Sequence, residues 1–186
     1  MPFIDTFISD LKIFEPKVFE DNRGCFFESY NENTFKEAGI ITHFVQDNRS
    51  VSGKGTLRGM HYQLEPFAQA KLVTVLKGNV FDVAVDMRDN SPTFGKWFGI
   101  ELSEENKKQL FIPRGFAHGF LVLSDKAEFF YKCDNFYSKE DEQGFLFDDD
   151  TIKIDWPIDN IDVILSEKDK VLPTFKSAIH NFEYKK

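Results

Sequence analysis

Two histidines lie inside strand-like segments of the sequence, and each could act as a base. His61 belongs to the segment 57–63, and His118 belongs to the segment 112–120. An imidazole in an apolar cavity tends to stay neutral, because burial disfavours its cation, so it can accept a proton. Side-chain alternation predicts that both histidines point into one interior. A lone strand histidine is more often structural, and that alternative stays open for each of them.

Tyr131 is a candidate acid for the same interior. Alternation places it on one face with Ala127, Phe129 and Cys133. A base and an acid on opposite walls of a cavity could remove a proton from one face of a carbon and return it to the other, which is epimerisation. The alternative is a core phenol hydrogen-bonded to the backbone.

Two cations are placed where they could contact an anionic ligand. Arg58 precedes His61 by three residues, so strict alternation would put them on opposite faces, but a bulge at Gly59 would bring them together. Lys71 has the parity of Val73, which predicts an ammonium that points inward. A solvated lysine is the alternative.

A metal site is the rival interpretation. The segments 55–63 and 113–118 look like the two cupin motifs, whose histidines and glutamate often bind a metal. Here Gln63 stands where a second histidine is expected, and no suitably spaced glutamate follows. Because two histidines and an amide bind divalent transition metals poorly, we expect a cavity without metal. A metal-dependent cupin, such as a dioxygenase or isomerase, is the alternative.

The elements that must position these groups are mostly strands. Residues 81–87 alternate between an apolar and a polar row, and the turn at 77–79 joins them to the strand 71–76 as a hairpin. A short helix capped by Asn31 and a helical turn at 103–106 are also predicted. We therefore expect an all-β cupin-type double-stranded β-helix, or jelly roll, with a few short helices. The other predicted strands cover residues 23–30, 44–51, 56–64, 97–102, 110–112, 118–123 and 127–133.

The composition indicates one folded domain over residues 1–186, with a loop-rich carboxyl tail from about residue 157. The chain of 186 residues is 41% hydrophobic and has a net charge of -8, which argues against nucleic acid or an anionic membrane as a partner. The amino terminus does not resemble a signal peptide, so we expect a cytoplasmic protein. Cys25 and Cys133 are expected to stay reduced.

A set of motifs lies along the chain at residues 23–24, 44–48, 57–63, 71–73, 81–86, 91–95, 111–120, 131–132, 154–157 and 166–169. Together these motifs resemble those of the dTDP-4-dehydrorhamnose 3,5-epimerase family. This resemblance implies a homodimer with exchanged amino-terminal strands. It also implies epimerisation at C3 and C5 of dTDP-4-dehydro-6-deoxy-D-glucose, without metal or cofactor, to give dTDP-4-dehydro-L-rhamnose. The absence of a G-x-G-x-x-G sequence agrees with a reaction that needs no NAD.

The resemblance also implies roles for individual residues. His61 is the base, Asp169 orients it, Tyr131 is the acid, and Lys71 stabilises an enolate at the C4 oxygen. Alternatives are a 3-epimerase or a 5-epimerase of a related nucleotide-linked 4-keto sugar, and a non-catalytic sugar-nucleotide binding protein. The implied substrate contacts are Phe19, which would stack on thymine, and Arg23, Glu28, Gln46, Asp47, Asn48, Arg58, His118, Tyr137, Glu142 and Lys168.

Overall fold

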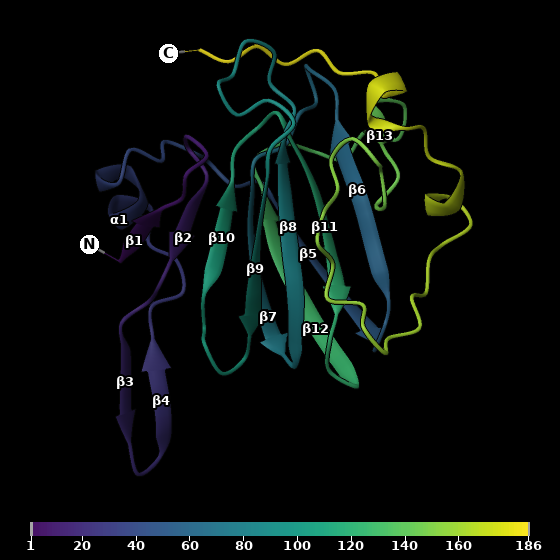
Figure 1. The fold of residues 1–186 in the computed structure, drawn as a ribbon. Coiled ribbons are helices and arrows are strands. Elements are labelled where there is room, and N and C mark those ends of the chain that lie inside the picture. Colours follow the sequence, from purple (N-terminus) through teal and green to yellow (C-terminus); the bar gives the residue numbers. More distant parts are fainter. Residues whose placement is uncertain (1, 186) are drawn as a thin grey trace.

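Two antiparallel sheets pack face to face in the computed structural model, which describes residues 2–185 (Figure 1). Most consecutive strands from β5 onward switch from one sheet to the other, which confirms the predicted jelly roll. The six-stranded sheet has the order β1 (Phe3–Asp5), β2 (Lys12–Phe14), β10 (Gln109–Ile112), β7 (Lys71–Lys77), β12 (Lys126–Cys133) and β5 (Gln46–Gly53). The five-stranded sheet has the order β13 (Glu142–Gly144), β6 (Leu57–Gln63), β11 (Phe116–Val122), β8 (Asn79–Asp86) and β9 (Trp97–Ser103).

The space between the sheets is filled by one row of side chains from each strand. Val73 of β7 and Phe129 of β12 meet Ala84 of β8 and Phe120 of β11 in one buried cluster. These strands read as alternating patterns because only alternate side chains point into the space between the sheets. Part of the interior of the jelly roll is therefore a buried apolar core.

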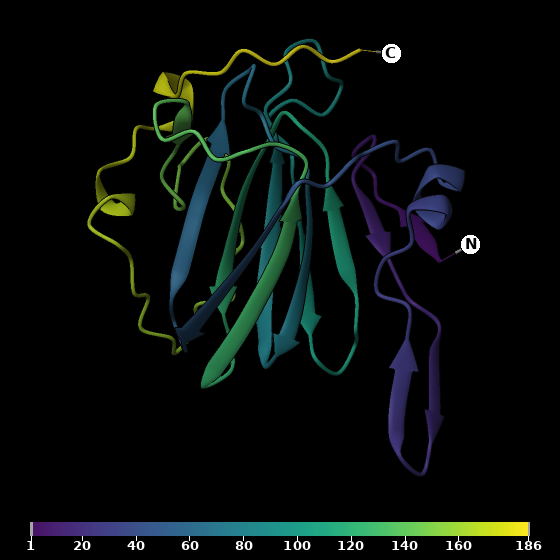
Figure 2. The same ribbon diagram turned by 180° about the vertical axis from the view of Figure 1, so that it is seen from behind.

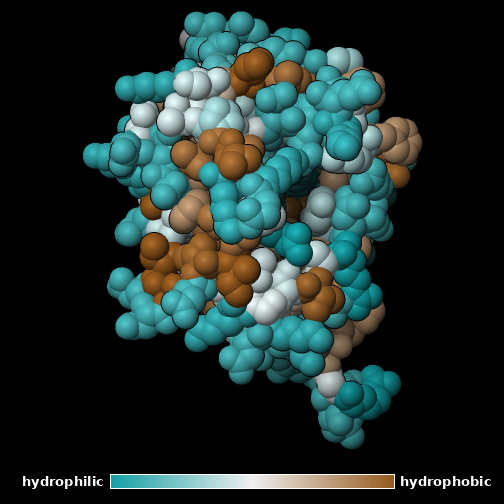
Figure 3. Space-filling model, turned by 90° about the vertical axis from the view of Figure 1, so that its right-hand side faces the viewer, coloured by the Kyte–Doolittle hydropathy of each residue, from teal (hydrophilic) through white to brown (hydrophobic). Residues whose placement is uncertain are grey.

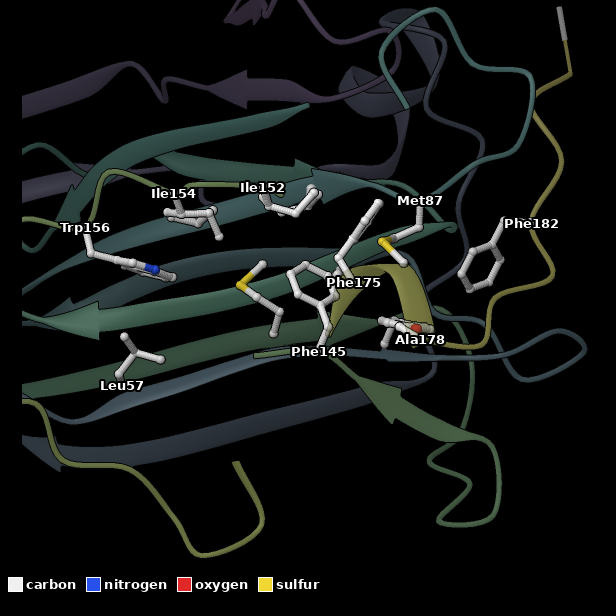
Figure 4. Close-up of a cluster of buried hydrophobic side chains, with 14 of the residues drawn as sticks. Leu57, Met87, Phe145, Ile152, Ile154, Trp156, Phe175, Ala178 and Phe182 are labelled. Atoms are coloured by element: carbon white, nitrogen blue, oxygen red, sulfur yellow. The ribbon is translucent and has the colours of Figure 1, made fainter. Parts of the chain in front are cut away.

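The outer face of the five-stranded sheet is covered by the carboxyl-terminal part of the chain. Figure 4 shows Trp156 near Leu57 of β6, and Phe175 beside Phe145 and Met87, all in one buried cluster. The chain there forms only two short 3-10 helices, η1 (Asp169–Val171) and η2 (Phe175–Ser177). The loop-rich region after Trp156 thus contributes side chains to a second core, and Figure 2 shows how little regular structure this region has.

This cover changes the environment of the strand at 81–87. Its apolar row packs under the tail, and its polar row points into the space between the sheets. Asp82 and Asp86 are both 0% exposed, so neither row of this strand faces water. The alternating pattern therefore arises from two buried faces of different polarity.

The amino-terminal half carries the predicted helix and a projecting arm. The helix α1 (Glu32–Glu37) begins at Asn31, whose side-chain oxygen accepts the Asn33 N–H at 3.0 Å. The hairpin of β3 (Val18–Asp21) and β4 (Gly24–Phe27), called the arm below, projects away from the sheets in Figures 1 and 2. Its strands pair with each other alone among the described residues.

The predicted helical turn at 103–106 is a single hydrogen-bonded turn, in which the Lys107 N–H donates to the Ser103 carbonyl at 3.1 Å, and it does not extend into a helix. Ser103 and Asn106 do exchange hydrogen bonds, of 3.1 and 3.0 Å, in the manner of a capping sequence. Lys107 then adopts a φ of 56°, which ends the turn and leads the chain into β10. The capping residues therefore close a loop between two strands.

No helix of residues 2–185 is long and apolar enough to cross a membrane.

Figure 3 shows the side of the molecule on which β6 and the tail lie, where apolar patches interrupt a largely hydrophilic surface.

Loss of the packing under the tail should destabilise the protein. Phe145 is fully buried and meets the Phe175 ring edge-on, with centroids 5.3 Å apart. We expect Phe145→Ala to lower the free energy of unfolding by about 3–5 kcal/mol, because it leaves a cavity between sheet and tail. Val171, which is 81% exposed, gives the control: Val171→Ala should change the free energy of unfolding by less than about 0.5 kcal/mol. Equal denaturation midpoints for the two variants would contradict a packed tail.

Candidate active site

A cavity of about 620 Å³ opens between the two sheets and the tail. Its polar lining comes from strands of both sheets and from the segment that leads into η1. It contains both histidines that alternation directed inward, and so confirms that they face one interior. The predicted site residues that line it are Asn48, Arg58, His61, Lys71, His118, Tyr131, Glu142, Lys168 and Asp169.

A bulge at Gly59 brings Arg58 and His61 to the same wall, as predicted. His61 lies opposite His118 and Arg58 lies opposite Phe120, so β6 has one residue more than β11 over this stretch. Strict alternation would put Leu57 on the same face as His61. The bulge instead turns Leu57 to the outer face of the sheet, into the cluster under the tail. Without the extra residue the guanidinium and the imidazole would point to opposite faces.

The bulge depends on a close approach of two backbones. Gly59 has a φ of 126°, and a Cβ built on it would lie 2.5 Å from the Cα of Gly119. A side chain at Gly59 would therefore push β6 away from β11 at the position of the two histidines.

His61 is held by a carboxylate from the tail. Its Nε2 lies 2.7 Å from Oδ1 of Asp169, which is buried at the start of η1. The Ser166 hydroxyl accepts the Asp169 backbone N–H at 3.1 Å. Burial raises the pKa of Asp169, but hydrogen bonds with His61 and Ser166 outweigh it and hold the pKa below its usual value. An ionised Asp169 thus orients the ring and leaves Nδ1 for a ligand.

Tyr131 lies on the opposite wall, on β12 of the other sheet. Burial, with smaller effects of Cys133 and Glu142, raises the pKa of its phenol, and Arg58 only partly opposes this. The phenol therefore stays protonated at neutral pH and can donate a proton.

Lys71 points inward from β7, in agreement with its predicted parity. Burial lowers the pKa of its ammonium group, and the charges of Cys133, Asp82 and Glu142 oppose that shift. This cation is placed to stabilise negative charge that develops on a bound ligand.

Glu142 links several predicted contacts at the rim of the cavity. It forms an ion pair of 2.5 Å with Lys168 and accepts the Tyr137 hydroxyl at 2.8 Å. Gln46 accepts the Tyr137 backbone N–H at 3.3 Å and donates to Asn48 at 3.0 Å. Burial raises the pKa of Glu142, but Lys168 and Tyr137 outweigh it, so the pKa lies below its usual value. Gln46 and Tyr137 thus adjoin the cavity through hydrogen bonds.

Four predicted contacts lie away from the cavity of this chain. Phe19 and Arg23 belong to the arm, where Arg23 pairs with Asp21. Glu28 follows the arm and accepts the Asn31 amide at 3.1 Å. Asp47 points to the outer face of its sheet, where it pairs with Lys132 at 3.0 Å. Within one chain, these four residues do not join the other candidates.

The structure adds residues that the site analysis had not selected. Phe120 and Phe129 stack in the cavity with centroids 4.2 Å apart, and their inward parity with His118 and Tyr131 was the available signal. Asp82 hydrogen-bonds to His118, and its signal was a carboxylate in the polar row of the strand 81–87. Within residues 2–185, no group of three or more His, Cys, Asp or Glu side chains could hold a metal ion.

The fold and this cavity define a cupin-type enzyme, with a histidine and a tyrosine on facing walls of the cavity. The family model described as dTDP-4-dehydrorhamnose 3,5-epimerase matches residues 5–177. The chain belongs to this family and is an epimerase.

Relatives and solved structures agree with this assignment. The dTDP-4-dehydrorhamnose 3,5-epimerase of Shigella flexneri is 62% identical over 170 residues, which cover 91% of this chain and 93% of that protein. The enzyme of the same name from Elizabethkingia anophelis superimposes with a TM-score of 0.90 at 58% identity, covering 94% of this chain and 96% of that one. The dTDP-6-deoxy-D-glucose-3,5-epimerase of Legionella pneumophila was solved with dTDP-4-keto-L-rhamnose. It superimposes with a TM-score of 0.90 at 51% identity, and the match covers 94% of this chain and 93% of that one.

Substitution of Gly59 should disturb both the fold and the site. We expect Gly59→Ala to lower the melting temperature and to weaken ligand binding, because its methyl group collides with Gly119. Gly39 is the matched control: its φ is also positive, at 81°, but a Cβ there would meet nothing within 4 Å. Gly39→Ala should therefore cost only about 1 kcal/mol of backbone strain. Thermal unfolding with and without dTDP measures both effects, and equal losses in the two variants would contradict the close-approach argument.

Proposed function

We propose that this epimerase converts dTDP-4-dehydro-6-deoxy-D-glucose into dTDP-4-dehydro-L-rhamnose by inverting C3 and C5. The observation that carries the proposal is the placement of the His61–Asp169 pair and Tyr131 on facing walls of one cavity. The names of the Shigella and Legionella proteins, and the sugar nucleotide in the Legionella structure, support the choice of substrate.

The chemistry of the substrate fits these groups. C3 and C5 flank the C4 ketone, so a proton removed from either carbon leaves an enolate. His61 takes the proton, and the carboxylate of Asp169 stabilises the imidazolium that forms. Tyr131 returns a proton to the other face. One pair of groups serves both carbons if the sugar turns over or changes pucker between the two steps.

Cations around the cavity match the anions of the substrate and of the intermediate. The ammonium of Lys71 stabilises the enolate oxygen at C4, where charge develops. Arg58 and Lys168 supply positive charge for the diphosphate. The sequence of proton transfers leaves the oxidation state of the sugar unchanged and calls for no redox cofactor. A metal-free reaction and a cytoplasmic location stay predictions from the sequence.

A second copy of the chain would complete the site. Phe19, Arg23 and Glu28, the contacts that the family resemblance implies, lie on or beside the projecting arm and outside the cavity. In a homodimer with exchanged amino-terminal strands, the arm of each copy would bring these residues to the nucleotide end of the other copy's cavity. The exposure of Phe19 and Phe26 on the arm fits a surface that another copy covers.

Deuterated water separates the roles of the base and the acid. We expect His61→Ala to abolish deuterium uptake at C3 and C5, because nothing else in the account removes the proton. Tyr131→Phe should still exchange deuterium into recovered substrate, because His61 can return it to the face it came from, but should form little epimer. NMR of the sugar nucleotide measures both. Full activity of His61→Ala would remove His61 as the base, and uptake at C3 alone in the parent protein would make it a 3-epimerase.

Mixed dimers test whether the arm acts in the second copy. His61→Ala and Arg23→Ala should each be impaired alone, the first in the base and the second in nucleotide binding. If the arm serves the neighbouring cavity, a mixed dimer has one cavity with both changes and one with neither. With equal amounts and random mixing, about a quarter of all cavities should then be intact, and activity should return to about a quarter of the parental value. Activity that never exceeds the sum of the separate variants would place Arg23 in the cavity of its own chain or outside any cavity.

A further inference from the structure

Asp82 is a buried carboxylate that the reaction described above does not use. It lies on β8 with the parity of Val80 and Ala84, so its side chain points into the space between the sheets. Oδ2 lies 2.9 Å from Nε2 of His118, whereas Oδ1 has no hydrogen-bond partner among residues 2–185. One oxygen of a fully buried carboxylate is thus left without a donor from the described chain.

A neighbour on the same strand shows what a structural carboxylate looks like here. Asp86 is equally buried, but Arg88 donates to both of its oxygens at 2.9 Å. Ser91 and Thr93 add hydroxyl donors at 2.6 and 2.7 Å. Burial of a carboxylate is costly unless its oxygens are satisfied in this way. Asp82 has a single hydrogen-bond partner among the described residues, the ring of His118, which points to a role beyond holding the fold together.

The surroundings of Asp82 are those of the proposed reaction. His118 lines the cavity and lies directly opposite His61 in the pairing of β11 with β6. The charged and titratable groups that act on Lys71 are Cys133 from β12, Asp82 from β8 and Glu142 from β13. Glu142 already pairs with Lys168, and Cys133 is a buried thiol that receives the Asn48 amide at 3.7 Å. Of the two carboxylates, Glu142 is thus already paired with a lysine, whereas Asp82 contacts only His118.

We propose that Asp82 is a positioning residue of the epimerase, which holds His118 with its proton on Nε2 and supplies a buried negative charge to the side of the cavity where His118 and Lys71 lie. The inference rests on the proposed function, because it assigns Asp82 to the side of the cavity that stabilises the enolate. Asp169 stabilises the cation of the base, and Asp82 acts on the groups that face the C4 oxygen, namely the ring of His118 and the ammonium of Lys71. The cavity thus contains two carboxylate–histidine pairs with separate tasks.

The physical reason lies in the burial of Lys71. Burial favours the neutral amine, which could not stabilise an enolate by its charge. A nearby fixed anion favours the ammonium form, and its field is strong because little water screens it. The bond from Nε2 to Asp82 also leaves Nδ1 of His118 as the ring nitrogen available to the substrate.

The matched variants Asp82→Asn and Asp86→Asn test this assignment. Asp82→Asn keeps an oxygen acceptor for His118 but removes the charge, so Lys71 should lose its proton at lower pH. We expect the alkaline limb of the kcat/KM profile to move down by about one pH unit, with kcat reduced about tenfold and KM nearly unchanged. Asp86→Asn should lower the melting temperature and leave the alkaline limb in place. If Asp82→Asn had the same pH profile of kcat/KM and the same kcat as the parent protein, the proposal would be overturned.

A second measurement uses the parent protein without substrate, so that it does not depend on the folding of a variant. In histidine labelled with nitrogen-15, NMR should find His118 protonated at Nε2 between about pH 6 and 8. The His118 signals are assigned by their loss in His118→Gln. A proton on Nδ1 alone would overturn the pairing with Asp82, whether or not Asp82→Asn folds. If the parent protein takes up no deuterium from solvent, the proposed function fails, and the NMR result still decides how Asp82 and His118 are paired.

Discussion

The hydrogen bond between His61 and Asp169 is the contact on which the arrangement of the site depends. It joins strand β6 of the barrel to a tail that has almost no regular secondary structure. The tail can present Asp169 at this point because Trp156, Phe175 and their neighbours fix it on the outer face of the five-stranded sheet. Packing on one face of the sheet thus sets the geometry of the chemistry at its edge.

The electrostatics of the cavity contrast with those of the whole molecule. The chain has a net charge of -8, yet the proposed substrate carries a diphosphate. Arg58, Lys71 and Lys168 gather on the cavity walls, and buried or half-buried carboxylates beside them balance the positive charge. Net charge argues against polyanions as partners, whereas binding of a small anion depends on this local arrangement.

Strand periodicity could predict much of the fold and part of the site. Alternation correctly directed His61, His118, Tyr131 and Lys71 to one interior, and a glycine next to Arg58 correctly predicted the bulge. Periodicity could not place Asp169, because nothing in a loop-rich segment constrains where a side chain points; only the family resemblance selected it. Nor could it show that the row with Asp82 is buried, because the layer that covers the other face comes from the distant tail.

The central claim is that two groups on opposite walls exchange protons with opposite faces of the sugar. It is tested most directly by a single turnover in deuterated water with enzyme in excess, followed by NMR of the product at C3 and C5. With Tyr131 as a separate acid in contact with solvent, the epimerised carbons should carry deuterium almost completely. Product that keeps much of the original hydrogen at those carbons would show that one group both removes and returns the proton, and would contradict the account.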